Sequence, residues 1–331
     1  MSSRSPASTN CLARRQLAGW CIQCGLGVLA AVTQALSAQG PPASASLRLP
    51  LEKAIARPVS VAFSHVAIPL DSVTFQAMVT SPFLRTEFGG FEDRPGSPGA
   101  PRPSFLYYGR DSYLEFLGLD TQFPVGSAQL AFVVDDPGGL HRAVDDLLVQ
   151  RPRVIAYSVA FRQLGAGSVP LFYRARIRPA VPPPHQVGSG PRPYLRADII
   201  ERHPGFLHRD DPTIPLDSAG ITQTQYLARR WRPNTYLRSV MGVTYAGDSI
   251  EVIELAGDLS AIGYELRQAA DTIIAMRPGF TLHLVPATAE RRGVLAVRLA
   301  TQRPKDGQKV YRFGPHSILR FENGNIAYWT F

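Results

Sequence analysis

A carboxylate lies in the middle of an apolar segment in SYLEFLGLD, where Glu115 shares a strand face with Tyr113 and Leu117. Burying a carboxylate is costly unless a cation, a metal or a hydrogen-bond donor pairs with it. A second polar group, His65, lies in another apolar segment, VSVAFSHVAIPL. If the two segments are neighbouring strands, the imidazole and the carboxylate converge, and these nitrogen and oxygen ligands suit a borderline or hard divalent ion. An open position on that ion would polarise a substrate oxygen.

Each of these residues also has a structural explanation. A single histidine on an apolar face is more often a hydrogen-bonded core residue than a ligand, and Glu115 can pair with Arg110 or another of the many arginines. A second polar cluster, HPGFLHRDD at residues 203–211, contains two histidines and two aspartates. Its spacing matches no established zinc pattern, so a solvated loop is the better interpretation.

The chain lacks the sequence patterns of several enzyme classes. It has no G-x-S-x-G nucleophile motif, no H-E-x-x-H zinc motif and no G-x-x-x-x-G-K phosphate-binding loop. The adjacent pair His316 and Ser317 would face opposite ways on a strand and form no catalytic pair. All cysteines lie in the N-terminal segment, at positions 11, 21 and 24, so a chain processed after that segment contains no thiol for catalysis or for a disulfide.

Residues 1–38 have the features of a signal peptide. Arg14 and Arg15 precede the uncharged segment 17–36, and the small residues of ALSAQG favour cleavage near Ala38. The arginine pair is also compatible with twin-arginine export. The apolar segment is about 20 residues long, just enough to span a bilayer, so an uncleaved anchor is the alternative. We expect a secreted or periplasmic protein with no stable membrane insertion after cleavage, and N-terminal sequencing of the mature chain should begin near Gln39.

The composition is that of a globular protein. Hydrophobic residues make up 45% and charged residues 18% of the 331 positions, enough for a core in one large domain or two moderate ones. The formal charge of +9 falls to +6 without residues 1–38, which contain three arginines and no acid. The arginines are scattered among acids instead of lining one stripe between aromatic residues, so we expect no nucleic-acid partner.

Prolines and glycines divide the folded part into repeated segments. After a linker at 39–58, residues 59–70 are predicted as a strand, 72–84 as a helix and 92–103 as a loop, and SFLYYG and SYLEFLGL as a hairpin. The same pattern of strand, helix and strands restarts at Ser127. A short helix is expected in PLDSAGITQTQYLARRWRP. The C-terminal third is expected to repeat the pattern, with a long helix at 258–276 and strands up to Phe331.

Three short motifs resemble the vicinal oxygen chelate superfamily, which includes glyoxalase I, bleomycin-resistance proteins and extradiol dioxygenases. They are HVAIPLD (65–71), YLEFL (113–117) and QLAFVVDD (129–136). The resemblance implies an α+β fold in which repeated βαβββ modules form curved mixed sheets around a cleft. The C-terminal tail resembles that of an uncharacterised glyoxalase-like branch, which offers no activity to inherit. The implied domains are a paired module at 59–205 and a C-terminal α+β module of similar type at 206–331.

The resemblance also implies a set of metal ligands, because members with a metal take them from the first and last strands of each module. His65 and Glu115 occupy those positions in the first module, and Gln129 takes the place of a first-strand histidine in the second. Glu201, in ADIIERHP, is the candidate for the fourth ligand or for a catalytic general base. The ion would be zinc, nickel, manganese or iron.

Three classes of function follow from these features. The leading hypothesis is an exported metal-dependent lyase, isomerase or dioxygenase-type enzyme that acts on a small oxygenated molecule. The alternative is a metal-free protein of the same fold that binds and sequesters a small apolar or aromatic ligand. In the third, the sheet faces serve for association with another subunit, as in a homodimer. Fold-level analogy does not decide among these chemistries, and whether the chain is an enzyme stays open.

Overall fold

The computed structural model describes residues 59–95, 103–119, 123–164, 167–178, 192–208, 213 and 220–331. The chain divides into two compact units, residues 1–54 and 55–331, and every described residue belongs to the second. The predicted signal peptide and linker therefore lie outside the described residues. Within the described part, no helix is long and apolar enough to cross a membrane.

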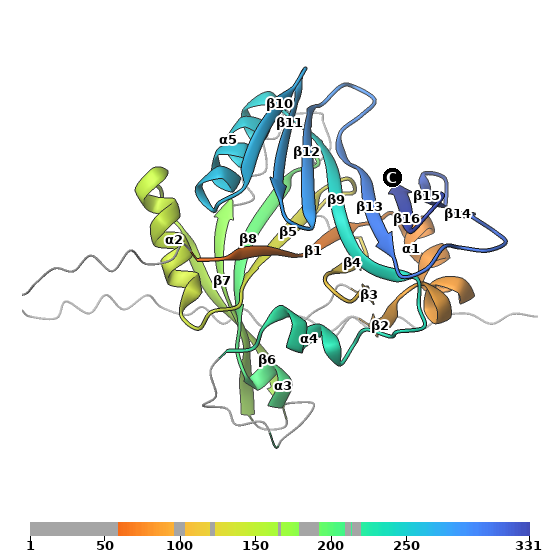
Figure 1. Cartoon of the computed structure of the whole chain (residues 1–331), viewed down its shortest axis with the longest axis horizontal. Helices are drawn as coiled ribbons and strands as arrows, with labels where there is room; N and C mark the ends of the chain where they lie inside the picture. The colour runs from red at the N-terminus through yellow and green to blue at the C-terminus, as the bar shows by residue number, and fades with distance from the viewer. Residues whose placement is uncertain are drawn as a thin grey trace, which may run out of the picture. The chain divides into compact units, whose positions relative to one another are not determined.

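An eight-stranded mixed sheet forms from residues 61–202, in the order β2-β3-β4-β1-β5-β8-β7-β6 (Figure 1). Each half consists of a strand, a helix and three further strands, and β1 and β5 pair antiparallel where the halves meet. The first strand of each half pairs parallel with the last, β1 with β4 and β5 with β8. The elements of this first sheet are β1 (Val61–Pro69), α1 (Ser72–Val79), a π-helical turn η1 (Leu84–Phe88), β2 (Gly90–Arg94), β3 (Ser104–Tyr108), β4 (Tyr113–Leu117), β5 (Ala128–Val134), α2 (Gly139–Gln150), β6 (Ala156–Leu164), β7 (Gly167–Arg178) and β8 (Leu195–Arg202).

A second eight-stranded sheet repeats this topology, in the order β10-β11-β12-β9-β13-β16-β15-β14. Its third module keeps the helix after the first strand, whereas in the fourth module residues 302–309 join the first two strands without a helix. The elements are β9 (Leu237–Gly247), α5 (Ser249–Ala261), β10 (Glu265–Ala269), β11 (Thr272–Arg277), β12 (Phe280–Pro286), β13 (Gly293–Thr301), β14 (Val310–Phe313), β15 (Ser317–Phe321) and β16 (Ile326–Thr330). The predicted α+β fold of repeated βαβββ modules is confirmed.

Two predicted elements are wrong in detail. The long helix predicted at 258–276 does not form, because α5 ends before Gly263, whose φ of +91° is left-handed, and β10 and β11 follow as a hairpin. The predicted loop at 92–103 begins with strand β2, which pairs with β3. The charged residues of β2 resemble a loop in sequence, but Glu92 and Arg94 pair with each other.

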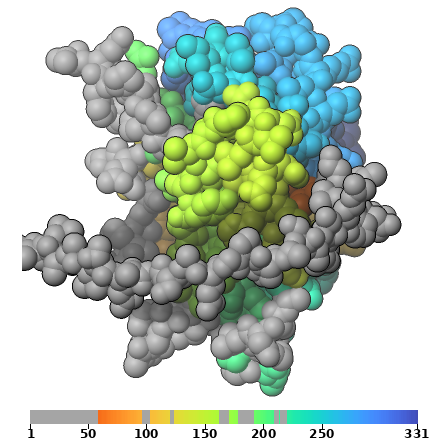
Figure 2. Space-filling view, turned by 90° about the vertical axis from the view of Figure 1, so that its left-hand side faces the viewer, coloured from red at the N-terminus to blue at the C-terminus, as the bar shows by residue number. Residues whose placement is uncertain are grey.

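The two sheets share one hydrophobic core. Phe116 of β4 lies 5.0 Å from Trp329 of β16, and Phe63 of β1 stacks on Phe280 of β12 at 3.8 Å between ring centroids. Helices α2 and α5 contact each other and lie side by side on the surface (Figure 2). One face of the first sheet is therefore used for packing against the second sheet, and the other face is left for a different role.

The part of the chain that connects β8 to β9 covers part of the face of the first sheet that does not pack on the second sheet. It contains α3 (Gly205–His208) and α4 (Gln223–Ala228), which lie on the opposite side of the first sheet from the second sheet (Figure 1). The short helix predicted in this segment corresponds to α4, which begins with a capping box formed by Thr222 and Gln225. Apolar residues of the segment, including Tyr226, pack on Tyr108 and Tyr113 of the sheet. The segment thus encloses one end of the face that carries the predicted site.

Candidate functional site

His65, Glu115 and Gln129 share one face of the first sheet. Ala67 on β1 lies opposite Glu115 on β4 and opposite Gln129 on β5, and His65 is two residues before Ala67. Directly opposite residues on neighbouring strands point to the same side, and so do alternate residues of one strand. The three predicted side chains therefore point to the side that faces α3 and α4. We call this side of the sheet the site face.

Glu201 points to the other side. It lies opposite Val134, whose side chain belongs to the core, so the strand alternation that groups the other three residues excludes Glu201. Its carboxylate accepts hydrogen bonds from the backbone N–H of Gly138 at 2.7 Å and of Leu140 at 2.9 Å. These donors form the first turn of α2, where a negative charge also complements the helix dipole. The structure gives Glu201 the position of a helix cap and does not bring it to His65.

A carboxylate that the sequence analysis did not single out occupies the site face instead. Asp198 of β8 lies opposite Ala131 of β5, which shares a face with Gln129, and Gln129 Nε2 donates to Asp198 Oδ2 at 2.8 Å. Asp198 is fully buried, and three arginines surround it, Arg196 at 3.1 Å, Arg176 at 3.5 Å and Arg174 at 4.0 Å. The sequence offered one signal for Asp198: it lies three residues before Glu201, and residues at an odd spacing on a strand point to opposite faces. Only one of the two carboxylates could therefore share the site face.

His65 is held as a neutral imidazole. It is 8% exposed and stacks on Tyr113, with 4.2 Å between ring centroids. Burial lowers the pKa of His65 well below its ordinary value, and the positive charges of Arg202 and Arg94 lower it further. Nδ1 of His65 lies 3.1 Å from the hydroxyl of Ser64. The ring can thus accept or donate a hydrogen bond near neutral pH, but it carries no charge there.

Glu115 faces an arginine, as one interpretation of the sequence required, although the partner is Arg94 and not Arg110. The carboxylate of Glu115 lies 4.0 Å from Arg94 Nη1. Arg94 in turn donates to Glu92 at 2.7 Å, and the hydroxyl of Tyr108 donates to the other oxygen of Glu92 at 2.6 Å. Burial alone would raise the pKa of Glu92, but the hydrogen bonds from Arg94 and Tyr108 hold it below its ordinary value.

These side chains do not fit a divalent metal ion. The carboxylates of Glu92, Glu115 and Asp198 on the site face lie beside arginines, whose positive charge would repel an added cation. The third predicted ligand, Gln129, donates its amide to Asp198. In the described ranges, no group of three or more His, Cys, Asp or Glu side chains is placed to hold a metal. The implied zinc, nickel, manganese or iron therefore finds no matching donor set at these residues.

The polar cluster at 203–211 is only partly described. Nδ1 of His203 accepts a hydrogen bond from the backbone N–H of Gly205 at 3.0 Å, at the start of α3. Burial lowers the pKa of His203 below its ordinary value. Asp210 and Asp211 lie outside the described residues.

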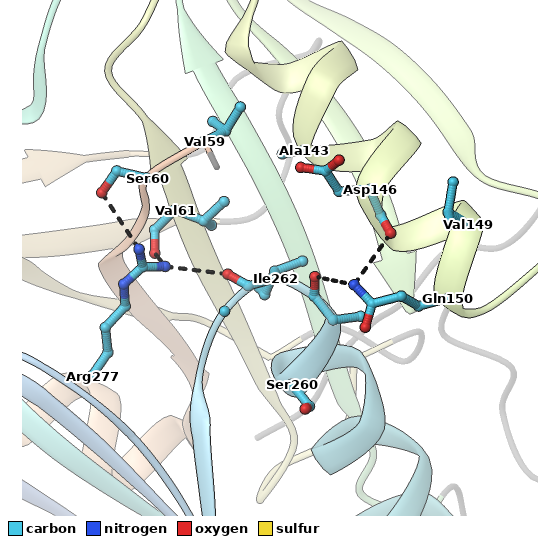
Figure 3. A pocket seen from close by; sticks show the side chains of 12 residues that line it. Val59, Ser60, Val61, Ala143, Asp146, Val149, Gln150, Ser260, Ile262 and Arg277 are labelled. Atoms are coloured by element: carbon cyan, nitrogen blue, oxygen red, sulfur yellow. Dashed lines mark hydrogen bonds between the residues drawn. The ribbon is translucent and has the colours of Figure 1, made fainter. Parts of the chain in front are cut away.

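A cavity of about 540 Å³ lies away from the site face, between α2, the end of α5 and the start of β1 (Figure 3). The guanidinium of Arg277 projects toward the start of β1, where it donates to the backbone oxygens of Val61 and Ile262. Gln150 of α2 donates to the backbone oxygen of Ala261 at 3.2 Å. None of the four predicted site residues lines this cavity, and these two polar side chains are already bonded to the main chain, so it does not replace the site face as the candidate.

Comparisons with known proteins give a family and several distant folds. A family model described as "Family of unknown function (DUF5829)" matches residues 63–331. A search of the curated proteins found no match. Similar solved structures include a hypothetical protein from Staphylococcus aureus, with 10% identity and a TM-score of 0.43 over 81% of this chain and 97% of that chain.

Two further solved structures are named for their activity. The Mn(II)-bound glyoxalase from Novosphingobium aromaticivorans has 10% identity and a TM-score of 0.38, over 70% of this chain and 63% of that chain. A variant of homoprotocatechuate 2,3-dioxygenase from B. fuscum has 9% identity and a TM-score of 0.39, over 84% of this chain and 74% of that chain.

Proposed function

Since the chain belongs to the family of unknown function DUF5829, which supplies no activity to inherit, we propose its function from the site face: it binds a small molecule there without a metal ion. In this proposal it is a glyoxalase-like protein of the binding type. The features of residues 1–38 favour its export, so the ligand would be met outside the cytoplasm.

The observation that carries the proposal is the pairing of the site-face carboxylates Glu92, Glu115 and Asp198 with arginines. Glu115 is 19% exposed and Arg94 38% exposed at the side chain, so this pair lies at the boundary of the core and the solvent. Between Glu115 on β4 and Asp198 on β8, strand β1 presents His65 and Ala67 to the site face, and strand β5 presents Gln129 and Ala131. Small-molecule sites are usually lined by apolar and aromatic side chains, with a few polar groups that fix the orientation of the ligand. The site face combines Ala67, Ala131 and Tyr113 with such polar groups.

Binding is favoured over metal-dependent catalysis because the polar groups are already satisfied as ion pairs. A lyase, isomerase or dioxygenase of the implied kind needs an ion with an open position. A general base needs a carboxylate or imidazole free to take a proton, whereas Glu115 and Asp198 are paired with arginines and His65 is buried beside two of them.

The test is ligand binding by the full chain after treatment with EDTA. We expect that, in a library of small aromatic and aliphatic compounds, some shift the ring resonances of His65 in ¹H–¹⁵N spectra and leave those of His283 unchanged. His283 is a matched control because it lies on β12 of the second sheet and its pKa is also lowered, by burial and by Arg298. A library that moves neither histidine in EDTA, but moves His65 after a divalent ion is added, would overturn the proposal.

A further inference from the structure

Arg202, at the end of β8, is a buried cation that has no acidic partner among the described residues. It is 3% exposed, and its Nη2 donates to the hydroxyl of Ser64 at 3.0 Å. Its guanidinium lies 4.2 Å from the ring centroid of Tyr226 in α4. Nη1 is buried and makes no hydrogen bond, and within the described ranges no carboxylate lies within 4.0 Å of the guanidinium. Arg202 thus has a packed position and an unused pair of N–H donors.

Other arginines that have one buried nitrogen show that this is exceptional. Arg151 and Arg153 also have a buried nitrogen without a hydrogen bond, but both contact Asp258, at 2.8 and 2.7 Å. Arg176 contacts Asp198 at 3.5 Å. Removing a charge from water is costly, and native proteins offset the cost with an opposite charge. Among the four arginines with such a buried nitrogen in the described part of the chain, only Arg202 lacks one.

The unused donors belong to the site face. Arg202 lies four residues after Asp198 on β8, and residues at an even spacing on a strand point to the same side of the sheet. The hydroxyl of Ser64 lies between Arg202 Nη2 and His65 Nδ1, at 3.0 and 3.1 Å. Gln223 of α4 closes the group, because its amide oxygen accepts from the same hydroxyl at 3.3 Å. The guanidinium is therefore held in place beside His65 from two directions, by the sheet and by α4.

We propose that Arg202 binds the carboxylate of a small organic anion, an inference that rests on the binding function proposed above. The carboxylate accepts hydrogen bonds from Nη1 and supplies the negative charge that the buried guanidinium lacks. The apolar part of the ligand meets the aromatic side chains next to Arg202 and His65, Tyr226 and Tyr113. A monoanion fits better than a phosphate dianion because the neighbouring Arg94 is already paired with Glu92.

The test uses the full chain in EDTA with benzoate, its neutral analogue benzamide, and inorganic phosphate as probes. We expect benzoate to raise the melting temperature of wild type more than either of the others. Arg202→Met should weaken benzoate binding by about 30-fold or more, because one partner of a buried charge pair is lost. Without a ligand, Arg202→Met should melt no lower than wild type, because the variant no longer buries an unpaired charge. Arg320→Met, at an exposed position of β15, should behave as wild type.

A second measurement on wild type needs no variant. Burial is the main cause of the lowered pKa of His65, and the charges of Arg202 on β8 and Arg94 on β2 lower it further. A carboxylate bound to Arg202 offsets one of these charges, so benzoate should raise the pKa of His65, whereas benzamide should leave it unchanged. Tyr113 and Glu115 of β4 are the other titratable side chains on the neighbouring strand, and the ring of His65 stacks on Tyr113. His283 of β12 in the second sheet serves as the reference, because benzoate bound at Arg202 should leave its pKa unchanged.

Several outcomes would overturn the inference. They are equal binding of benzoate by wild type and Arg202→Met, an equal response of wild type to benzoate and benzamide, or a larger response to phosphate. If neutral compounds shift the His65 resonances and carboxylates do not, the anion site is wrong and the proposed binding function stands. If no compound of any charge shifts them, both are wrong.

Discussion

Asp198→Asn is expected to destabilise the fold by about 3 kcal/mol, because it leaves three arginines of the site face without their shared counter-charge. Asn keeps the shape of Asp198 and can still accept the hydrogen bond from Gln129, so the change isolates the charge. Breaking a buried ion pair by removing one partner costs about 3–5 kcal/mol. The arginines are 19–29% exposed and keep some hydration, which places the expected value at the lower end.

Urea unfolding of the Asp198→Asn variant measures this loss as a change in free energy of unfolding. Salt should restore part of it, because added anions screen the repulsion among the arginines. Asp271→Asn is the matched control, since Asp271 is exposed in the turn between β10 and β11, and it should change stability by less than about 0.5 kcal/mol. A loss below about 1 kcal/mol for Asp198→Asn, or one that salt leaves unchanged, would contradict this account of the cluster.

Trp329→Ala is expected to cost about 3–5 kcal/mol, because it removes the largest fully buried side chain from the core that joins the two sheets. The indole lies 5.3 Å from the ring of Phe88 in η1 and 5.0 Å from that of Phe116 in β4, and both elements belong to the first module. Its Nε1 donates to the hydroxyl of Ser317 at 2.8 Å. The substitution therefore opens a cavity and also leaves a buried hydroxyl with one partner fewer.

Tyr328→Ala provides the control for this substitution. Tyr328 is the preceding residue of β16 and points to the opposite face, where it is 37% exposed. It should cost much less than Trp329→Ala, and both changes can be compared by chemical and thermal unfolding. A similar loss of stability in the two variants would contradict the claim that the two sheets share one core. So would two separate melting transitions of Trp329→Ala, one of them unchanged from wild type.

The first modules could be predicted from the sequence because apolar and polar residues alternate strongly along their strands. HVAIPLD and YLEFL place their polar residues among apolar ones, which predicted that His65 and Glu115 share a face. The family resemblance added Gln129 of QLAFVVDD to this pair. The fourth module was not foreseen as a separate repeat, because it has no helix to mark its start. The helix predicted at 258–276 failed because its apolar residues suit a helix as well as a hairpin, and Gly263 decides between them.

The strand register explains why the sequence alone did not identify Asp198 as a residue of the site. Asp198 and Glu201 are three residues apart on β8, so only one of them can share the face of Gln129, and the pairing with β5 selects Asp198. The importance of Arg202 depends on the absence of a carboxylate within 4.0 Å of it in the part of the chain that the structure describes. A sequence with many arginines and many acids does not show which arginine is left without a partner, because ion pairs form between residues far apart in the chain, such as Arg153 and Asp258.

The central claim is that the site face works without a metal ion, and metal titration of the EDTA-treated full chain tests it most directly. A metal that binds the folded state raises the melting temperature by mass action. The account predicts that zinc, nickel, manganese and ferrous iron leave the melting temperature of wild type and of Glu115→Gln unchanged. A rise in wild type with any one of these ions, lost in Glu115→Gln, would contradict it and restore the metal site.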